Sequence, residues 1–482
     1  MEMKPHIAMF PGPGIGHLTP FLELAKRLVL AHGLQVSFIV IDTLDPSSPQ
    51  HKLLTSLPSD LTVIRLPPAD PSAILIPDVT LLITRISLIV KDSIRFLKPA
   101  LAKLPPVHAF ITDVFGTEVF ETCSELRIPV YSYVTASAWT LALCLYLPKL
   151  DPDLDGEFFY EPVRIPDCTP IRPDDMIDQI KNRKMTDYDW FLLHGTRMRS
   201  AEGVLVNSWE GLEGGTLAAL GRLVDGGVSV PPVHAIGPVV RDGEELVEQE
   251  GIELIKWLDD QPVCSVLLVS FGSGGTLSRS QMTELAHGLE MSQQRFVWVV
   301  REPTDDTVSG SYFNAGENGA KPNSDYLPDG FLDRVRCLGR VVRNWAPQMA
   351  VLRHRSTGAF LSHCGWNSCL ESTLTGVPII AWPLFAEQKM NATLLSEEIK
   401  VVIRPAVEPG KGIMSREEVE RVVRAVMEGD EGKALKTRAE EVKMSALKAV
   451  DHDGTVEYVT WRNIPHRLVR GREGDLYWIV EP

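Results

Sequence analysis

The chain has 482 residues, of which 44% are hydrophobic and 23% charged, and its formal net charge is -15. This composition is typical of a globular protein with enough chain for two domains, whose core needs no metal or disulfide to hold it. The acidic balance argues against a nucleic-acid-binding protein, because binding to phosphates relies on Lys and Arg side chains.

Seven cysteines are scattered along the chain without a C-x-x-C pair, which is typical of reduced thiols in a cytosolic protein. The apolar stretch before Pro11 is too short for a signal peptide. Residues 128–148 carry no charge and are long enough to cross a bilayer. Their proline and hydroxyl side chains instead favour a buried strand, a polar loop and the start of an apolar helix. We therefore expect a cytoplasmic protein without a membrane-inserted segment.

The chain begins with an apolar run at 6–10, a glycine-rich turn, a segment of helical periodicity at 18–30 and a second apolar run at 36–41. This order is a βαβ unit, and continuously apolar strands predict a parallel sheet that is covered on both faces. Further strands are expected at 61–66, 109–112, 130–134 and 203–206.

The same pattern returns in the second half, with a strand at 265–270, the glycine turn FGSGG and a helix at about 278–290. Two α/β halves in series are therefore predicted. The acidic segment 241–251 is expected to link them, and residues 302–328, rich in Gly, Asn, Ser and Asp, to form a surface loop. Other elements of this half are expected as strands at 296–300, 339–343, 359–361 and 379–382 and a helix from Asn367.

The first glycine turn, Gly12 to His17, follows a strand, where glycines let the backbone approach a ligand. Its G-x-G-x-G spacing departs from the G-x-G-x-x-G dinucleotide fingerprint, so it is weak evidence for a nicotinamide cofactor. His17 lies where the helix begins, at the mouth of a sheet crevice, and is well placed as a general base. The alternative is a histidine that only caps the helix or forms local hydrogen bonds.

Asp113 ends the apolar run at 109–112 and is therefore expected in the same crevice as the glycine turn. A carboxylate beside an imidazole fixes its tautomer and stabilises the imidazolium. Asp113 is accordingly a candidate partner of His17. The alternative is an aspartate that caps the next helix.

A second polar group follows the strand at 359–361, in the sequence SHCGWNS. Free N–H groups at a helix start attract phosphate oxygens, and Asn367 and Ser368 add side-chain donors there. His363 is placed to donate to the same phosphate. Glu371, one helical turn further on, is placed to accept from ribose hydroxyls.

Two further pairs flank this segment. Trp345 and Gln348 precede it, and an indole can stack on a nucleobase while an amide bridges hydroxyls. Glu387 and Gln388 follow the next strand and suit the vicinal hydroxyls of a sugar. Each residue alone has a structural explanation, but all fall at the carboxyl ends of strands in one half. Together they predict a nucleotide-sugar site.

Residues 345–388, WAPQMAVLRHRSTGAFLSHCGWNSCLESTLTGVPIIAWPLFAEQ, resemble without a gap the signature of plant UDP-dependent glycosyltransferases of small molecules. The resemblance extends from PHIAMFPGPGIGHLTP to about Gly454. The segments IPDCTPIRPDD, LVNSWEGLE and SFGSGGTLS are most similar to the hydroquinone (arbutin synthase) type, near the indoxyl-glucosylating enzymes of indigo plants. After Gly454 the sequence departs from the usual family ending, a helix that returns to the first domain.

The resemblance implies a GT-B fold, in which two Rossmann-like domains with parallel sheets face a cleft. Residues 1–240 would bind the acceptor, 241–251 would link the domains, 252–454 would bind the UDP-sugar, and 455–482 would form a tail that packs back on the first domain. It also implies an inverting, metal-independent transfer of glucose from UDP-glucose to a small aromatic acceptor such as hydroquinone, another phenol, a monolignol or indoxyl. No cofactor and no metal are expected, and the protein is expected to be a monomer.

Carried over by position, His17 matches the family base and Asp113 its partner. Trp345 matches the residue that stacks on uracil, and Gln388 favours glucose over galactose. The full set of implied donor-binding residues is Ser273, Trp345, Ala346, Gln348, His363, Trp366, Asn367, Ser368, Glu371, Glu387, Gln388 and, from the first domain, Thr135.

Acceptor-binding residues are expected in loops of the first half, where aromatic and aliphatic side chains favour a flat, small aromatic alcohol. The D-x-D triplets within 151–155 and at 451–453 do not follow strands of the donor half, so they predict surface turns and not a metal site. The acceptor candidates are Phe115, Glu118, Trp139, Leu147, Ile180 and Phe191.

Two other functions remain as alternatives. The first glycine turn motivates a nicotinamide-dependent oxidoreductase. The unusual sequence after Gly454 motivates a non-catalytic protein that binds sugar nucleotides, although the His17 and Asp113 pair counts against it.

Overall fold

The computed structural model describes residues 4–43, 48–54, 57–72, 74, 81–154, 156–158, 161–224, 227–241, 249–303, 326–406 and 412–450. The chain divides into two compact units, Met1–Val240 with Lys448–Pro482, and Arg241–Leu447. The predicted tail, most of the predicted linker and most of the predicted loop at 302–328 lie outside the described residues. The described part of the predicted linker, from Gln249, belongs to helix α8 (Gln249–Asp259).

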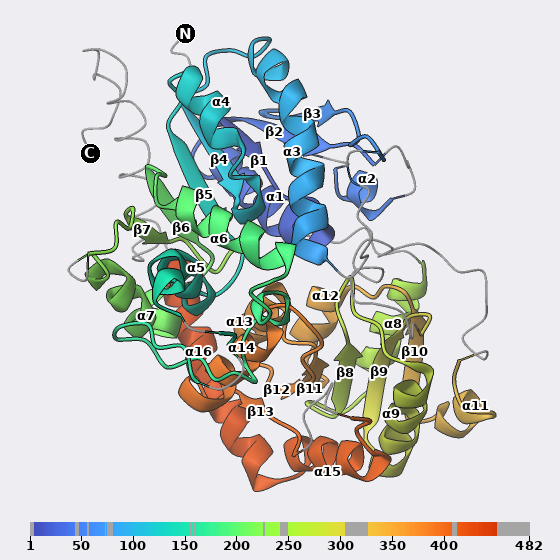
Figure 1. Cartoon of the computed structure of the whole chain (residues 1–482). Helices are drawn as coiled ribbons and strands as arrows, with labels where there is room; N and C mark the ends of the chain where they lie inside the picture. The colour runs from blue at the N-terminus through green and yellow to red at the C-terminus, as the bar shows by residue number, and fades with distance from the viewer. Residues whose placement is uncertain are drawn as a thin grey trace. The chain divides into compact units, whose positions relative to one another are not determined.

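The first unit contains a seven-stranded parallel sheet with the strand order β3-β2-β1-β4-β5-β6-β7 (Figure 1). The chain order reverses between β1 and β4, and in such open sheets ligands bind outside the carboxyl ends of the strands at this switch point. The strands are β1 (His6–Phe10), β2 (Gln35–Ile41), β3 (Leu61–Leu66), β4 (Ala109–Asp113), β5 (Val130–Val134), β6 (Gly203–Val206) and β7 (Val233–Ala235).

Alternation along β1 explains why helices cover both faces of this sheet. Ile7 and Met9 pack in one buried cluster with residues of α1, whereas Ala8 and Phe10 pack in another with residues of α3 and α4. Successive side chains of a strand point to opposite faces, so a fully apolar strand needs a partner on each side. The helices of this unit are α1 (Ile15–Leu30), α2 (Pro49–Leu53), α3 (Leu82–Leu101), α4 (Val119–Glu125), α5 (Ala138–Leu150), α6 (Thr186–Met198) and α7 (Glu210–Arg222), with short 3-10 turns η1 (Val114–Gly116), η2 (Asp151–Asp153) and η3 (Asp178–Ile180).

The second unit repeats this design with a six-stranded parallel sheet of order β10-β9-β8-β11-β12-β13. Its switch point lies between β8 and β11. Leu267 and Val269 of β8 face the cluster that contains α9 and α15 residues, and Val266 and Leu268 face the cluster of α8 and α12. The strands are β8 (Val266–Ser270), β9 (Arg295–Val300), β10 (Gly339–Arg343), β11 (Thr357–Ser362), β12 (Ile379–Ala381) and β13 (Val402–Ile403).

The helices that follow these strands complete the unit. Helix α13 directly follows the turn after β11. The helices are α8, α9 (Arg279–Ser292), α11 (Phe331–Val335), α12 (Gln348–Arg353), α13 (Trp366–Thr375), α14 (Gln388–Thr393), the π-helical turn η5 (Leu394–Glu398), α15 (Arg416–Met427) and α16 (Asp430–Val450).

Most predicted strands are confirmed, several of them with the same ends. Residues 128–148 form β5 and α5 as expected, and none of the helices in the described part of the chain is long and apolar enough to cross a membrane. The first helix begins at Ile15 and not at 18, so His17 lies in its first turn. The short strands β7 and β13 were not predicted, because two or three residues show no periodicity.

Candidate functional site

The switch point of the first sheet brings His17 and Asp113 together. β1 and β4 are parallel neighbours, with Phe10 paired to Thr112. His17 lies in the first turn of the helix after β1, and Asp113 ends β4. Nδ1 of His17 lies 2.8 Å from Oδ2 of Asp113. The structure thus brings together the two residues that the sequence predicted to lie near each other, while their catalytic roles remain predictions.

Asp113 is fully buried and held at both carboxylate oxygens. Oδ2 accepts from His17, and Oδ1 accepts from the backbone N–H of Phe115 at 2.9 Å. Asp113 is thus both the partner of the imidazole and the cap of η1. The sequence offered these contacts as alternatives, and the structure shows both. Gly12 leaves room for this carboxylate, because a Cβ built there would lie 2.8 Å from Oδ1 of Asp113.

This arrangement determines which nitrogen of His17 is basic. The carboxylate of Asp113 can only accept a hydrogen bond, so Nδ1 carries the hydrogen and Nε2 is the basic nitrogen of the neutral ring. Thr135 Oγ1 lies 3.4 Å from the same Nδ1. The imidazole side chain is 20% exposed, so it is accessible to a substrate while its partner is not.

Among the acceptor candidates, Phe115 is the one that contacts His17, with ring centroids 5.3 Å apart. Glu118 is mostly buried, and Oε1 accepts from Nη1 of Arg197 at 2.8 Å. Burial raises the pKa of Glu118, although the Arg197 charge opposes this shift. Its other oxygen, Oε2, is buried without a hydrogen-bond partner among the described residues. It is therefore placed to accept from a polar group.

The remaining acceptor candidates lie in the core of the first unit. They are buried side chains of α5, η3 and α6, and α6 packs against both other elements. The indole Nε1 of Trp139 donates to the carbonyl of Thr169 at 3.0 Å. Their contact with an acceptor stays a prediction for Trp139, Leu147, Ile180 and Phe191.

His194 was not predicted, although it supports Phe115. Its ring nitrogens lie 2.8 Å from Ser87 Oγ of α3 and 2.7 Å from Thr117 Oγ1, and its ring meets Phe115 edge-on. Burial lowers the pKa of His194 to about 3, so this imidazole is neutral. A histidine inside an amphipathic helix gives no sequence signal for such a role.

The switch point of the second sheet lies beside His363. This residue follows β11, and the glycine turn after β8 lies against its ring, because a Cβ on Gly272 would overlap the imidazole. Burial, aided by the Arg301 charge, lowers the pKa of His363 to about 4. Its Nδ1 is buried without a partner in the described part of the chain. A neutral ring with an unused nitrogen thus lies where a phosphate was predicted.

Helix α13 starts immediately after this histidine. Its N-cap is Gly365, and no side chain caps it. The first N–H groups of a helix lack intrahelical acceptors and favour an anion. Asn367 and Ser368 lie in this first turn, and Trp366 is buried beside them. The start of α13 therefore has the properties of the predicted diphosphate site.

The predicted ribose and base residues also lie together. Nε2 of Gln348 donates to Ser368 Oγ at 2.9 Å and to Glu371 Oε2 at 2.6 Å, which joins α12 to α13. Trp345 is 51% exposed, an unusual state for an indole, whereas Ala346 beside it is buried. An exposed indole next to a hydrogen-bonded amide and carboxylate is suited to a base and its ribose.

Glu387 and Gln388 follow β12 and start α14. Oε1 of Gln388 accepts from the N–H of Leu384 at 2.8 Å and of Phe385 at 3.1 Å, so this side chain is fixed by the turn. Asn391 was not predicted. Its Nδ2 donates to the carbonyl of Cys364 at 3.0 Å and lies 3.4 Å from Glu387 Oε1, so it connects the turn after β11 to the turn after β12.

Strained backbone marks the same edge of the second sheet. Asn344, Cys364 and Ala386 each have a positive φ, of 57°, 61° and 56°. They follow β10, β11 and β12 in turn. Left-handed conformations of residues other than glycine cost free energy and tend to cluster at functional sites. Three of them in loops that follow strands of one parallel sheet support a ligand site at this edge.

The D-x-D triplet at Asp151 forms the 3-10 turn η2, where Asp151 accepts from Tyr188 and pairs with Arg183 at 2.8 Å. This agrees with the predicted turn, and the second triplet lies outside the described residues. Over the described ranges, no group of His, Cys, Asp or Glu is arranged to hold a metal ion.

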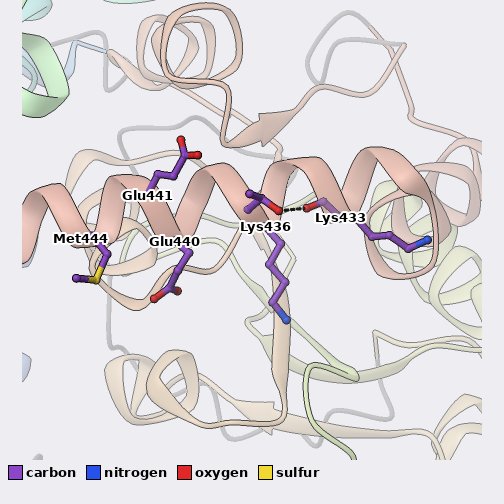
Figure 2. Close-up of a pocket in the computed structure, with 6 residues that line it drawn as sticks. Lys433, Lys436, Glu440, Glu441 and Met444 are labelled. Carbon is purple, nitrogen blue, oxygen red and sulfur yellow. Dashed lines mark hydrogen bonds between the residues drawn. The ribbon is translucent and has the colours of Figure 1, made fainter.

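A hollow of about 610 Å³ lies along α16. Its labelled side chains all project from this one helix (Figure 2). None of them is a predicted site residue, so this hollow is not the candidate site. It is lined by Lys433, Lys436, Thr437, Glu440, Glu441 and Met444.

Known proteins resemble the chain along most of its length. Residues 253–456 match the family model for UDP-glucoronosyl and UDP-glucosyl transferase. Hydroquinone glucosyltransferase of Rauvolfia serpentina is 43% identical over 463 residues, which cover 94% of this chain and 96% of that protein. The chain belongs to the plant UDP-glycosyltransferase family.

Solved structures of this family show the same architecture. The Phytolacca americana UGT2, complexed with UDP-2fluoro-glucose and pterostilbene, is 39% identical, covers 96% of this chain and 100% of its own, and has a TM-score of 0.85. A UDP-glucosyltransferase from Polygonum tinctorium capable of glucosylating indoxyl is 40% identical, covers 95% and 98% of the two chains, and also has a TM-score of 0.85. The predicted GT-B fold and the predicted family are confirmed. The chain is thus an enzyme of the glycosyltransferase class, and neither the oxidoreductase nor the non-catalytic alternative is retained.

Proposed function

We propose that this UDP-glycosyltransferase moves glucose from UDP-glucose to the hydroxyl group of a small aromatic acceptor, with inversion at the anomeric carbon and without a metal ion. The observation that carries the proposal is the pair formed by His17 and Asp113 at 2.8 Å. It supplies a base at the switch point of one sheet, while the other sheet carries the donor-type residues at its own switch point.

His17 would act as the general base through Nε2. This nitrogen takes the proton of the acceptor hydroxyl, and the carboxylate of Asp113 stabilises the imidazolium that results. The acceptor oxygen then bonds to the anomeric carbon as the bond from that carbon to UDP breaks. Attack from the face opposite the leaving group gives a β-glucoside.

The charge that develops on UDP would be stabilised by fixed dipoles of the second unit. The uncapped start of α13 offers N–H groups, and Asn367 and Ser368 add polar side chains beside them. Preorganised donors of this kind stabilise a leaving group without rearrangement during the reaction. A divalent ion is therefore not required for this step.

Glucose as the transferred sugar is supported by the two side chains after β12. Gln388 is fixed through its Oε1, which leaves its Nε2 as a donor, and Glu387 supplies a carboxylate next to it. An amide donor beside a carboxylate acceptor suits adjacent equatorial hydroxyls. The UDP-2fluoro-glucose bound by the Phytolacca americana relative agrees with this choice.

The class of acceptor is inferred from the relatives and from the surroundings of His17. The relatives act on hydroquinone or indoxyl, or bind pterostilbene. Phe115 contacts the imidazole, so a flat aromatic ring can pack beside the base. We propose a phenol, hydroquinone, monolignol or indoxyl as the acceptor, and a cytoplasmic monomer as the active form.

A panel assay tests this function. The protein is incubated with labelled UDP-glucose, UDP-galactose or UDP-glucuronate and with phenol, hydroquinone, coniferyl alcohol or indoxyl, and products are identified by mass spectrometry and anomeric NMR coupling. We expect β-glucosides from UDP-glucose. Products with retained anomeric configuration would contradict the single-displacement reaction, and transfer from UDP-glucuronate alone would contradict the donor.

A further inference from the structure

Arg301 lies at the centre of the donor edge of the second unit. It directly follows β9, and its guanidinium donates to two backbone carbonyls, that of Ser273 and that of Asn344, the latter at 3.2 Å. Ser273 belongs to the glycine turn after β8, and Asn344 precedes the exposed indole of Trp345. One side chain therefore joins the loop of the predicted diphosphate contact to the loop of the predicted base contact.

The hydrogen bonds and charge of this guanidinium set it apart from an ordinary ion pair. Among the described residues it pairs with no Asp or Glu, and its hydrogen bonds go to neutral carbonyl groups. Burial lowers the pKa of Arg301 to about 10, which leaves the group charged at neutral pH. A charge that is partly removed from water without a counter-ion is costly, and an anionic ligand would supply that counter-ion.

His363, which lies near Arg301, also indicates an anionic ligand. The Arg301 charge contributes to the lowered pKa of His363, so the two groups lie within electrostatic range. Nδ1 of His363 is buried and has no partner in the described part of the chain. Among the described residues, Arg301 is a cation without a counter-ion and His363, two positions before the uncapped N-cap Gly365, has a ring nitrogen without a partner. Together they match the charge and the hydrogen-bonding capacity of a diphosphate.

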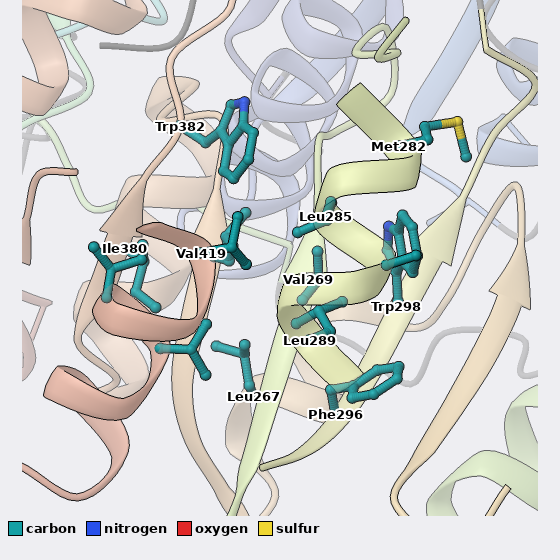
Figure 3. Close-up of a cluster of buried hydrophobic side chains, with 14 of the residues drawn as sticks. Leu267, Val269, Met282, Leu285, Leu289, Phe296, Trp298, Ile380, Trp382 and Val419 are labelled. Atoms are coloured by element: carbon teal, nitrogen blue, oxygen red, sulfur yellow. The ribbon is translucent and has the colours of Figure 1, made fainter. Parts of the chain in front are cut away.

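The strands that lead to Ser273 and Arg301 are firmly anchored. Val269 of β8 and Trp298 of β9 are buried in one cluster with Leu285 of α9 (Figure 3). A group held by a close-packed core keeps its position when the ligand arrives, which is what electrostatic preorganisation requires.

We propose that Arg301 is the fixed positive charge of the donor site, which balances the diphosphate of the nucleotide sugar and holds the Ser273 and Asn344 loops around it. The inference rests on the proposed function, because it presupposes that UDP-glucose binds to the second unit. Arg301 acts through its charge and through the two loops, and is therefore a positioning residue. It accounts for how a site without a metal ion accommodates a nucleoside diphosphate.

Two substitutions separate the charge from the hydrogen bonds. Arg301→Gln keeps an amide that donates to a carbonyl but removes the charge, whereas Arg301→Lys keeps the charge but loses the guanidinium fork. The dissociation constants of UDP and of uridine are measured by calorimetry for each protein. Uridine contains only the base and the ribose, so the ratio of the UDP and uridine dissociation constants measures what the diphosphate contributes to binding. Arg295→Gln removes an arginine from the opposite end of the same strand and is the matched control.

We expect Arg301→Gln to weaken UDP binding about 10- to 100-fold more than uridine binding, which is the usual range for a hydrogen bond to a charged group. In Arg301→Lys the ratio of the UDP and uridine dissociation constants should stay within about 10-fold of the wild-type value. In Arg295→Gln it should stay within about 2-fold. The proposal would be overturned if Arg301→Gln weakened UDP and uridine binding equally, so that the ratio of their dissociation constants did not change. It would also be overturned if Arg301→Lys changed this ratio as much as Arg301→Gln is expected to. If one of the two Arg301 variants does not fold, the result for the other is sufficient to test the proposal. Wild-type protein that binds neither UDP nor uridine would instead overturn the proposed function.

Discussion

His17 and Asp113 are 96 residues apart in the sequence, yet Nδ1 of the one lies 2.8 Å from Oδ2 of the other. The contact exists because β1 and β4 are neighbours at the point where the strand order of the first sheet reverses. The carboxylate is fully buried and the imidazole is partly exposed. A buried acid thus orients an accessible base, and its consequences for turnover can be measured.

Replacing His17 by alanine should reduce glucoside formation roughly 10²- to 10⁴-fold, because general-base catalysis contributes an effect of that size. Binding of UDP should remain within about 2-fold of the wild type, since the residues proposed to contact uracil, ribose and diphosphate all belong to the second unit. Turnover and UDP affinity are compared with those of His287→Ala, which removes a partly exposed imidazole from α9. Near-normal turnover of the His17 variant would rule this residue out as the base.

Gly12 offers an independent test of the geometry. A Cβ at this position would lie 2.8 Å from Oδ1 of Asp113, so Gly12→Ala should push the carboxylate away from His17. Misplacement of a catalytic group by about 1 Å can lower the rate 10²-fold. We expect kcat to fall about 10- to 100-fold while the fold persists, as judged by circular dichroism.

Gly16→Ala is the matched control for this change. It lies in the same glycine-rich segment, but a Cβ there meets nothing within 4 Å. Its kcat should stay within about 2-fold of the wild type, because Ala is also the better helix former. Equal losses in the two variants would show that the turn tolerates no side chain at all, and the specific role of the Asp113 contact would be wrong.

Most strands of both sheets could be predicted because they are short runs made largely of apolar residues. The run at 6–10 becomes β1 without a change of ends, and the run at 339–343 becomes β10. Sites at strand ends could be predicted for the same reason, since Asp113 directly follows one such run and His363 lies two positions after another. At these positions the end of an apolar run and the presence of a polar side chain both indicate a site.

Other site residues could not be predicted, because their role depends on contacts between distant segments. Arg301 looks in the sequence like any charge after a strand, and only its two carbonyl acceptors in separate loops reveal its position. Asn391 and His194 lie inside helices, where a polar residue usually faces solvent. Periodicity also did not show that α1 starts at Ile15, because the glycines there lack side chains to carry a pattern.

Removal of divalent ions should leave the activity unchanged. We expect dialysis against EDTA to alter turnover by less than about 2-fold, because the helix start and nearby donors serve the role that a metal ion otherwise serves. Initial rates are measured before dialysis, after it, and after addition of magnesium or manganese. A large loss that either ion restores would contradict the metal-independent reaction.

Acid should destabilise the fold through His194, whose pKa is lowered to about 3 by burial. The unfolded state protonates its histidines near 6.5, so below that pH it binds a proton that the folded state does not. The free energy of unfolding should therefore be constant with respect to this group above about pH 6.5 and fall by up to about 1.4 kcal/mol per pH unit below it. His363, with a pKa of about 4, should add a similar slope over the upper part of this window.

His194→Gln isolates the contribution of His194, because Gln keeps a donor and an acceptor for Ser87 and Thr117 but cannot be protonated. Urea unfolding is measured for wild type, His194→Gln and His287→Gln at several values between about pH 7.5 and about pH 5. The His194 variant should lose less of its unfolding free energy across this range than the other two proteins. If its slope equals that of the wild type, the imidazole is already protonated in the folded state, and the buried neutral bridge between α3 and η1 is wrong.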